Sequence, residues 1–341
     1  MERLAIAVAP YGQLTKLADD LFWARFTLPF RLNHINLYMI DTKQGWVLID
    51  AGIHSDETAA QWDALLKGPL SGQPIARIII THHHVDHIGY AGLLAQRTNA
   101  PVYMSAQEAE KAQWLIEQDD DDFATLVANT YTGYGLDEAN CQLARQDKGR
   151  FRRHVAPLPD MNIITQGERI VSRAGVFEVR IDEGHSQAHI GLVDKNRGLY
   201  IAMDFLLPRI SPNISVDLRD LNKDMLGAYL SYLHDITQMD ERWHIFPGHD
   251  WPFTKGASRA AALISHHNER LDALCAAAQK NPLTVDDAMG VLFGKSFEAH
   301  ELYFASGEAR AHLTHLVATG KMVMNACDDR TAPIYFALSQ P

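Results

Sequence analysis

The stretch THHHVDH at Thr81–His87 holds four histidines and one aspartate in seven positions, and it continues the apolar run ARIIIT at residues 76–81. A short apolar run of this kind predicts a strand that is covered on both faces. On an extended segment alternate residues point to the same side, so His82 and His84 can reach one metal ion together. His83 then points away, and we do not expect it to be a ligand.

Asp86 and His87 lie where the next helix is predicted to begin, in reach of a second metal ion. Two ions need more ligands than this cluster offers, so further ligands are expected downstream. His185 follows the apolar strand VFEVRI, Asp204 ends YIAMD and His249 lies in IFPGHD. Loops that follow buried strands converge at one edge of an α/β structure. Imidazole and carboxylate ligands suit zinc, iron(II) or manganese, whereas soft-metal sites favour thiolate.

The chain around this cluster alternates between strands and helices. Two strands precede it, joined by a turn at residues 43–45, and a helix from Asp56 stops at Gly68-Pro69. A helix over residues 87–98 is predicted directly after the cluster. This alternation indicates an α/β fold.

Residues 106–160 interrupt the alternation with a polar, helix-prone insertion that could form a lid over the site. Its basic side chains at Arg150, Arg152 and Arg153 either hold an anionic substrate group or form a solvated helix face. Long connections often carry specificity.

After residue 255 the pattern predicts three helices and a terminal hairpin around an Asp-Asp-Arg turn, the outline of a winged helix. We expect one domain over residues 1–255 and a second, mainly helical domain over residues 256–341. The second carries 7 Lys plus Arg against 9 Asp plus Glu, a balance of -2. Nucleic-acid binding depends on basic surfaces, so nucleic acid is not expected as a partner. His266 and His267 are interpreted as helix-surface or interface residues rather than ligands.

The bulk composition is that of an ordinary globular protein: 341 residues, 47% hydrophobic, with a net charge of -11. The three cysteines, Cys141, Cys275 and Cys327, are far apart and odd in number, which argues against a disulfide framework and a thiolate metal site. The N-terminus lacks the apolar core of a signal peptide, and no run of 18 apolar residues occurs. We therefore expect a cytoplasmic protein with no membrane contact.

The pattern His82-x-His84-x-Asp86-His87, followed by His185, Asp204 and His249, resembles the metallo-β-lactamase superfamily over roughly residues 20–255. The resemblance implies an α/β fold in the form of a four-layer αββα sandwich. LIDAG at residues 48–52 matches a family segment that would place Asp50 behind the ligands. His189 completes a spacing similar to the family's glycine-histidine repeat, although Asp182-Glu183 replaces its usual Thr-Pro.

The resemblance implies a role for each ligand and two divalent ions, zinc in the first place, with iron or manganese as alternatives. One ion would be held by His82, His84 and His185. The other would be held by Asp86, His87 and His249, with Asp204 bridging the two. The commonest zinc β-lactamases have cysteine in place of that aspartate, so Asp204 favours the thioesterase, lactonase and phosphodiesterase branches.

The C-terminal half resembles the branch of glyoxalase II-like and lactamase-β-2-like hydrolases that carry a winged helix. The implied reaction is attack of a dimetal-bound hydroxide on a thioester, a lactone or a related ester or amide of a small molecule. Asp86 would be the catalytic residue that takes the proton passed to the leaving group. Asp50 would orient the ligands, and His189 would either share that role or be a buried, hydrogen-bonded histidine. Arg209 is the candidate for holding an anionic substrate group.

Two other functions remain open from the sequence. A mononuclear-iron persulfide dioxygenase on the same fold would keep the same ligand motif. A nucleic-acid-binding protein or ribonuclease would use the winged helix, which we expect instead to pack on its neighbour or to form a homodimer.

Overall fold

The computed structural model describes residues 1–341 except 147–148, 156, 295–296, 298, 326–332 and 340–341. The described chain forms two compact units. The first consists of residues 1–117, 151–212 and 235–260, and the second of residues 118–150, 213–234 and 261–341. The domain boundary near residue 255 stays a prediction, since two earlier segments join the C-terminal residues in the second unit.

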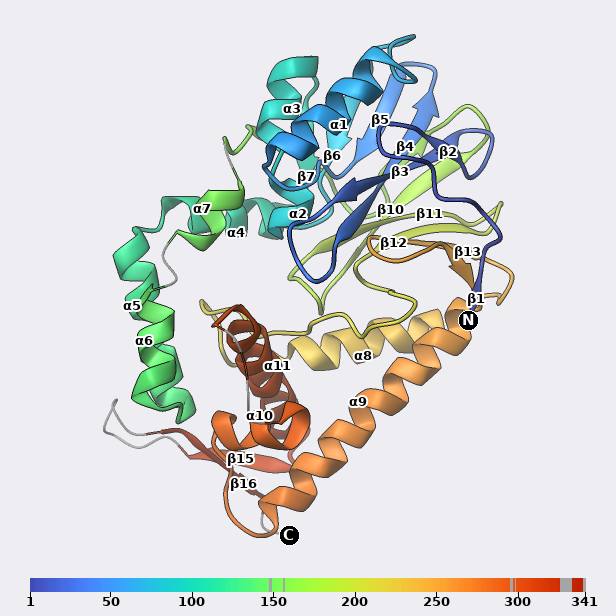
Figure 1. The fold of residues 1–341 in the computed structure, drawn as a ribbon. Helices are drawn as coiled ribbons and strands as arrows, with labels where there is room; N and C mark the ends of the chain where they lie inside the picture. Colours follow the sequence, from blue (N-terminus) through green and yellow to red (C-terminus); the bar gives the residue numbers. More distant parts are fainter. Residues whose placement is uncertain (147–148, 156, 295–296, 298, 326–332, 340–341) are drawn as a thin grey trace. The chain divides into compact units, whose positions relative to one another are not determined.

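The first unit contains two seven-stranded sheets (Figure 1). One sheet has the order β2 (Thr15–Lys16), β3 (Leu21–Thr27), β4 (His34–Thr42), β5 (Gly45–Ile49), β6 (Ile75–Ile79), β7 (Val102–Met104) and β8 (Met161–Ile163). The other has the order β1 (Glu2–Arg3), β14 (Phe253–Thr254), β13 (His244–Pro247), β12 (Leu199–Met203), β11 (His189–Asp194), β10 (Val176–Asp182) and β9 (Arg169–Val171).

The apolar runs of the sequence become strands that are buried on both faces. In β4, Tyr38 and Ile40 join an apolar cluster that also contains side chains of the other sheet, such as Phe177. Leu37 and Met39 of the same strand belong to a second cluster on the opposite face. Because successive side chains of a strand alternate between faces, a strand covered on both sides is apolar throughout.

Helices cover the outer face of the first sheet. The second cluster includes side chains of α1 (Asp56–Lys67), α3 (Ala91–Thr98) and α4 (Ala106–Glu117). Figure 1 shows α1 and α3 along this side of the sheet. Ser55 caps the N-terminus of α1, because its side chain accepts a hydrogen bond from the backbone N–H of Thr58. Gly68 caps the C-terminus, where the sequence predicts the end of the helix.

The helix predicted over residues 87–98 is divided into α2 (Val85–Ile88) and α3. The division falls at Gly89, where an added Cβ would lie 2.4 Å from the carbonyl oxygens of both Val85 and His154. Only glycine allows such a close backbone approach. Helical periodicity in the sequence does not reveal a contact with residue 154, so the break was missed.

The insertion at residues 106–160 is helical, as predicted. It contains α4, α5 (Asp120–Tyr134), α6 (Glu138–Gln146) and α7 (Arg150–His154). The first unit includes α4, whereas α5 and α6 belong to the second unit. Its role as a lid stays a prediction.

The predicted order of three helices and a hairpin is present, and all of it after residue 260 belongs to the second unit. These are α9 (Gly256–Ala278), α10 (Val285–Phe293), α11 (Ala299–Ala318) and the antiparallel pair β15 (Met322–Asn325) and β16 (Tyr335–Leu338). The helix α8 (Met225–Ile236) precedes them. Thr284 caps α10 and forms a capping box with Asp287. The Asp-Asp-Arg turn lies outside the described residues, and the winged-helix assignment stays a prediction.

Cys141 and Cys275 are free thiols, and Cys327 lies outside the described residues. Within the described ranges, none of the helices combines the length and the apolar character needed to span a bilayer.

Candidate metal centre

Four loops of the first unit carry the seven predicted ligands. The loop after β6 carries His82 and His84, and α2 directly after it carries Asp86 and His87. The other ligands follow β10, β12 and β13 in the second sheet: His185, Asp204 and His249. The structure brings all seven together in three overlapping sets, and the ligand atoms of each set lie within 4.8 Å of one another: His82, His84 and His185; His82, His87 and Asp204; and Asp86, His87 and His249. The set that contains Asp204 connects the other two, which correspond to the two predicted ligand groups.

The first group consists of three histidines. His82 Nε2 lies 2.9 Å from His84 Nδ1 and 3.3 Å from His185 Nε2. Burial, and then the neighbouring histidines, lower the pKa of His82 and His84 well below the usual value. Neutral imidazoles offer nitrogen lone pairs to a metal ion, so this group supports the predicted first ligand set.

The second group combines carboxylates with histidines. His249 Nε2 lies 3.4 Å from Asp86 Oδ2, and Asp204 Oδ2 lies 3.3 Å from His249 Nε2 and 3.4 Å from His87 Nε2. The same Asp204 oxygen is 3.7 Å from Nε2 of His185 in the first group. One carboxylate oxygen therefore faces both groups, which supports a bridging position.

The residues present fit divalent cations. Asp204 Oδ1 and His87 Nε2 are buried and have no hydrogen-bond partner within the described structure. Buried polar atoms without partners are rare and call for an explanation such as a bound ion. Gly248 keeps the space beside Asp204 open, since a Cβ there would lie 2.1 Å from Asp204 Oδ1.

The charge of the site also favours cations. Burial alone would lower the pKa of His249, but the carboxylates of Asp204 and Asp86 raise it to about 10. The two carboxylates therefore attract positive charge strongly in a place from which water is largely excluded.

Asp50 lies behind the ligands, where the resemblance expects it. It follows β5 with a φ of 64° and is fully buried. Its carboxylate accepts hydrogen bonds from the backbone N–H of Thr81 at 2.7 Å and from the Thr81 hydroxyl at 2.8 Å, and it lies 2.7 Å from His87 Nδ1. A carboxylate at Nδ1 fixes the imidazole so that Nε2 is directed to the metal site. His249 is held in the same way by the carbonyl oxygen of His34, 2.8 Å from its Nδ1.

His189 lies beside the ligands at the start of β11. Its ring centroid is 4.8 Å from that of His82 and 4.6 Å from that of Phe205. Burial lowers the pKa of His189 to about 3, so the ring is neutral. It packs on a ligand, and its orienting role stays a prediction.

His83 is turned away from the ligands, in agreement with the alternation of the extended segment. Its Nδ1 lies 2.6 Å from Oε2 of Glu108, a buried residue of α4. Sequence reasoning missed Glu108, because a lone glutamate in a polar helical stretch carries no signal of burial.

Arg209 is 60% exposed at its side chain. Its guanidinium lies 5.6 Å from the ring centroid of Trp251, and its Nη1 is 3.8 Å from Asp250 Oδ1. Both partners directly follow the ligand His249 in the chain, so Arg209 is near that loop. A contact with substrate stays a prediction.

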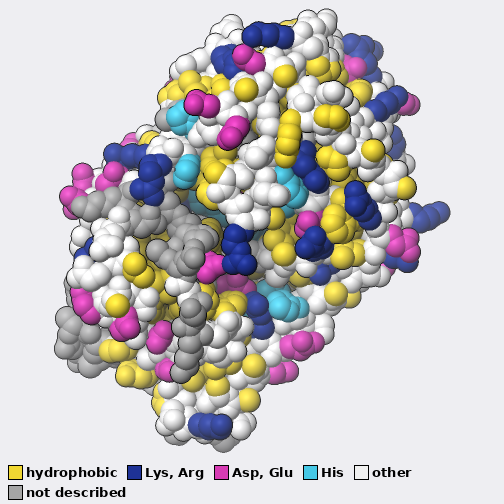
Figure 2. Space-filling model, in the orientation of Figure 1, with side chains coloured by type: hydrophobic (Ala, Val, Ile, Leu, Met, Phe, Trp, Pro, Cys, Tyr) yellow, Lys and Arg dark blue, Asp and Glu magenta, His cyan; other side chains and the backbone are white. Residues whose placement is uncertain are grey.

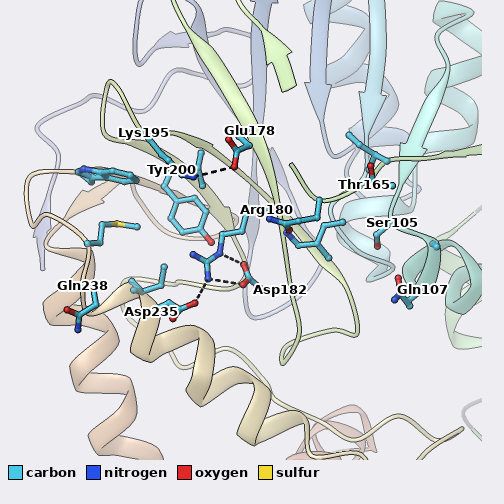
Figure 3. Close-up of a pocket in the computed structure, with 18 of the residues that line it drawn as sticks. Ser105, Gln107, Thr165, Glu178, Arg180, Asp182, Lys195, Tyr200, Asp235 and Gln238 are labelled. Carbon is cyan, nitrogen blue, oxygen red and sulfur yellow. Dashed lines mark hydrogen bonds and ion pairs between the residues drawn. The ribbon is translucent and has the colours of Figure 1, made fainter. Parts of the chain in front are cut away.

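A cavity of about 880 Å³ lies elsewhere, on the face of the second sheet that carries Glu178, Arg180 and Asp182 (Figure 3). None of the predicted ligands lines it. Arg180 contacts Asp182 at 2.5 and 2.8 Å, and Lys195 lies 3.3 Å from Glu178. Asp235, also in the lining, lies 3.5 Å from Arg180.

Known proteins share this architecture. The sequence profile of the Metallo-beta-lactamase superfamily matches residues 31–249, and that of the metallo-beta-lactamase-like C-terminal domain matches residues 271–333. The chain belongs to the metallo-beta-lactamase superfamily and is a metallo-hydrolase of that superfamily, whose members use divalent metal ions.

Similar proteins match nearly the whole chain. The probable metallo-hydrolase YqjP of Bacillus subtilis is 23% identical over 311 residues, which cover 88% of this chain and 93% of YqjP. The crystal structure of a beta-lactamase domain protein from Burkholderia ambifaria is 27% identical, with a TM-score of 0.89, and the match covers 99% of this chain and 98% of that one. A metallo-beta-lactamase family protein from Thermus thermophilus shares the fold at a TM-score of 0.77 and 23% identity, over 95% of this chain and 100% of its own.

Proposed function

We propose that this metallo-hydrolase cleaves a carboxylic thioester, a lactone or a related ester or amide of a small molecule, with two divalent ions, zinc in the first place, at the candidate centre. The observation that carries the proposal is the position of Asp204 Oδ2, which lies within 3.7 Å of histidine nitrogens from both ligand groups. Seven ligands divided in this way suit two ions better than one.

Two divalent cations would supply an activated water nucleophile and polarise the oxygen of the scissile carbonyl. The residues of the chain prepare the site for this chemistry. His82, His84 and His185 would hold one ion, and Asp86, His87 and His249 the other, with Asp204 shared. Asp50 keeps the His87 ring in the orientation that directs Nε2 to the centre.

Asp86 is proposed to move the proton. Its side chain is 17% exposed, whereas that of Asp204 is 9% exposed and that of His249 is 2% exposed. Asp86 is thus the better placed carboxylate to meet a substrate. Its Oδ atoms would accept a proton and return it to the leaving group. Arg209 would hold an anionic group of the substrate.

The test is to measure hydrolysis of a thioester, a lactone, a β-lactam and a phosphodiester by the metal-loaded protein, with His84→Ala as the inactive control. We expect activity on the thioester or the lactone and none in the control. Cleavage of only the phosphodiester would contradict the proposed substrate class, whereas cleavage of only the β-lactam would restrict it to amides. If the protein instead holds one iron per chain and consumes oxygen when a persulfide is added, the proposed function would be that of a persulfide dioxygenase and not of a hydrolase.

The remaining expectations are also proposals. A small-molecule substrate and a homodimer are favoured over nucleic acid. Figure 2 shows basic and acidic side chains intermixed among the described residues on the face in view, whereas nucleic-acid binders usually gather basic ones. A salt-dependent shift of RNA in a gel assay would overturn this. The free thiols of Cys141 and Cys275 support a reducing compartment such as the cytoplasm.

A further inference from the structure

A buried glutamate joins two of the ligand loops. Glu108 is fully buried in the first turn of α4. Its Oε2 accepts a hydrogen bond from the backbone N–H of His83 at 3.0 Å and lies 2.6 Å from the ring Nδ1 of the same residue. Its Oε1 accepts a hydrogen bond from the backbone N–H of Ala188 at 2.9 Å. One carboxylate therefore contacts the loop after β6 and the loop after β10.

The beginning of α4 also binds the carbonyl group of Ala188. The hydroxyl of Ser105, directly before α4, donates a hydrogen bond of 2.6 Å to the Ala188 carbonyl oxygen. Both backbone polar groups of Ala188 are thus bound to the beginning of α4. Ala188 lies three residues after the ligand His185, and His83 lies between the ligands His82 and His84.

These two loops come from different sheets, since β6 belongs to the first and β10 to the second. Their ligand atoms must nevertheless meet closely, because His82 Nε2 and His185 Nε2 are 3.3 Å apart. A backbone hydrogen bond of 2.9 Å from Ile190 to Thr81 joins the loops at one end. Glu108 provides a second connection, next to the ligands themselves.

The environment of Glu108 keeps its carboxylate charged and therefore able to accept at both oxygens. Burial would raise its pKa, but His83 and the backbone N–H groups of His83 and Ala188 lower it to about 2. The N-terminal turn of a helix also favours a negative charge. Charge-assisted hydrogen bonds of this kind are short and strong, and so they restrict both loops.

We propose that Glu108 is a positioning residue that sets the separation of the His82–His84 pair from His185 and thereby the metal affinity of the first ligand group. The inference rests on the proposed metal site and concerns a residue that binds no metal. Groups behind the ligands of a metal site commonly change affinity 10- to 100-fold when they are altered.

The test is Glu108→Gln in the full-length protein. Glutamine keeps the size of the side chain, but its NH₂ group must face either the Ala188 N–H or the His83 N–H, so one loop loses its acceptor. We expect zinc to bind the first ligand group about 10- to 100-fold more weakly in a competition titration. We also expect the visible absorption of the cobalt(II)-substituted protein to change, because that spectrum follows ligand geometry.

Two variants serve as controls. Glu117→Gln removes an exposed carboxylate from the same helix and should leave zinc affinity and the cobalt spectrum as in the wild type. Leu94→Ala removes a buried side chain of α3 and should lower the melting temperature with both metal readouts unchanged.

The outcomes separate the two proposals. Wild-type zinc affinity and an unchanged cobalt spectrum in Glu108→Gln would overturn the positioning role, even if the variant melts at a lower temperature as Leu94→Ala does. Failure of the wild-type protein to bind zinc or cobalt would instead overturn the proposed metal site. Ser105→Ala should weaken zinc binding in the same direction but less, because the N–H of Ala188 is still held.

Discussion

The pair of variants His83→Ala and His84→Ala tests whether His84 binds metal while the neighbouring His83 instead contacts Glu108. His84 Nδ1 lies 2.9 Å from His82 Nε2 within the first ligand group, so its removal takes one of three ligands. His83 contributes a hydrogen bond to the buried Glu108 instead, and its side chain is 15% exposed. The two variants should therefore fail in different ways.

The size of each effect follows from these contacts. A hydrogen bond to a charged group contributes about 1.5–3 kcal/mol. A domain of 150–250 residues loses about 2–4 °C of melting temperature per kcal/mol, so His83→Ala should melt about 3–12 °C lower. It should still bind metal, since the backbone N–H of His83 continues to hold Glu108. His84→Ala should lose metal and all hydrolysis.

The assay is metal analysis after dialysis, combined with thermal unfolding and hydrolysis of the best substrate of the panel. Equal loss of metal from both variants would refute the division of roles. Full metal content and activity in His84→Ala would refute its assignment as a ligand.

Three further predictions follow from the site and from the second unit. Chelation should lower the melting temperature, because metal ions at 1,000 times their Kd stabilise the folded state by about 4 kcal/mol. An unchanged melting temperature would contradict a structural contribution of the metal. Asp50→Asn should weaken metal binding about 10- to 100-fold, since the amide cannot accept from both Thr81 and His87, and a titration that matches wild type would refute the orienting role. Burial lowers the pKa of His312 to about 4, so the folded state favours the neutral ring. The resulting contribution to the free energy of unfolding is fully present above pH 6.5, the pKa of histidine in the unfolded chain. That contribution, about 3 kcal/mol, is lost as the pH falls from 6.5 towards 4. The urea midpoint should therefore fall between pH 7.5 and pH 5, and fall less in His312→Gln; the same pH dependence in both proteins would contradict this assignment.

The clustering of the proposed ligands could be predicted from the sequence because their spacing and their position after apolar strands are both local features. His82 and His84 are related by the two-residue period of an extended segment, and His185, Asp204 and His249 each follow a recognisable strand. Asp50 was found only through the resemblance, since its burial and its contact with His87 depend on packing.

Features that depend on distant contacts could not be predicted. At Gly89, between α2 and α3, the backbone of residue 154 approaches closely, and the role of Glu108 requires α4 to lie beside two loops. The division of the insertion between the two compact units likewise depends on packing rather than on composition. Sequence patterns indicate which residues share one face of a helix or strand, whereas these features are set by tertiary contacts.

We propose that Asp204 is shared between two metal ions that serve hydrolysis. The most direct measurement is the metal content per chain of the purified, metal-saturated protein, made in parallel with hydrolysis of the thioester and lactone substrates under anaerobic and aerobic conditions. We expect two divalent ions per chain, one ion or fewer in Asp204→Ala, and hydrolysis that does not require oxygen. A single iron per chain with activity that consumes oxygen, or two ions retained by Asp204→Ala with full hydrolysis, would contradict it.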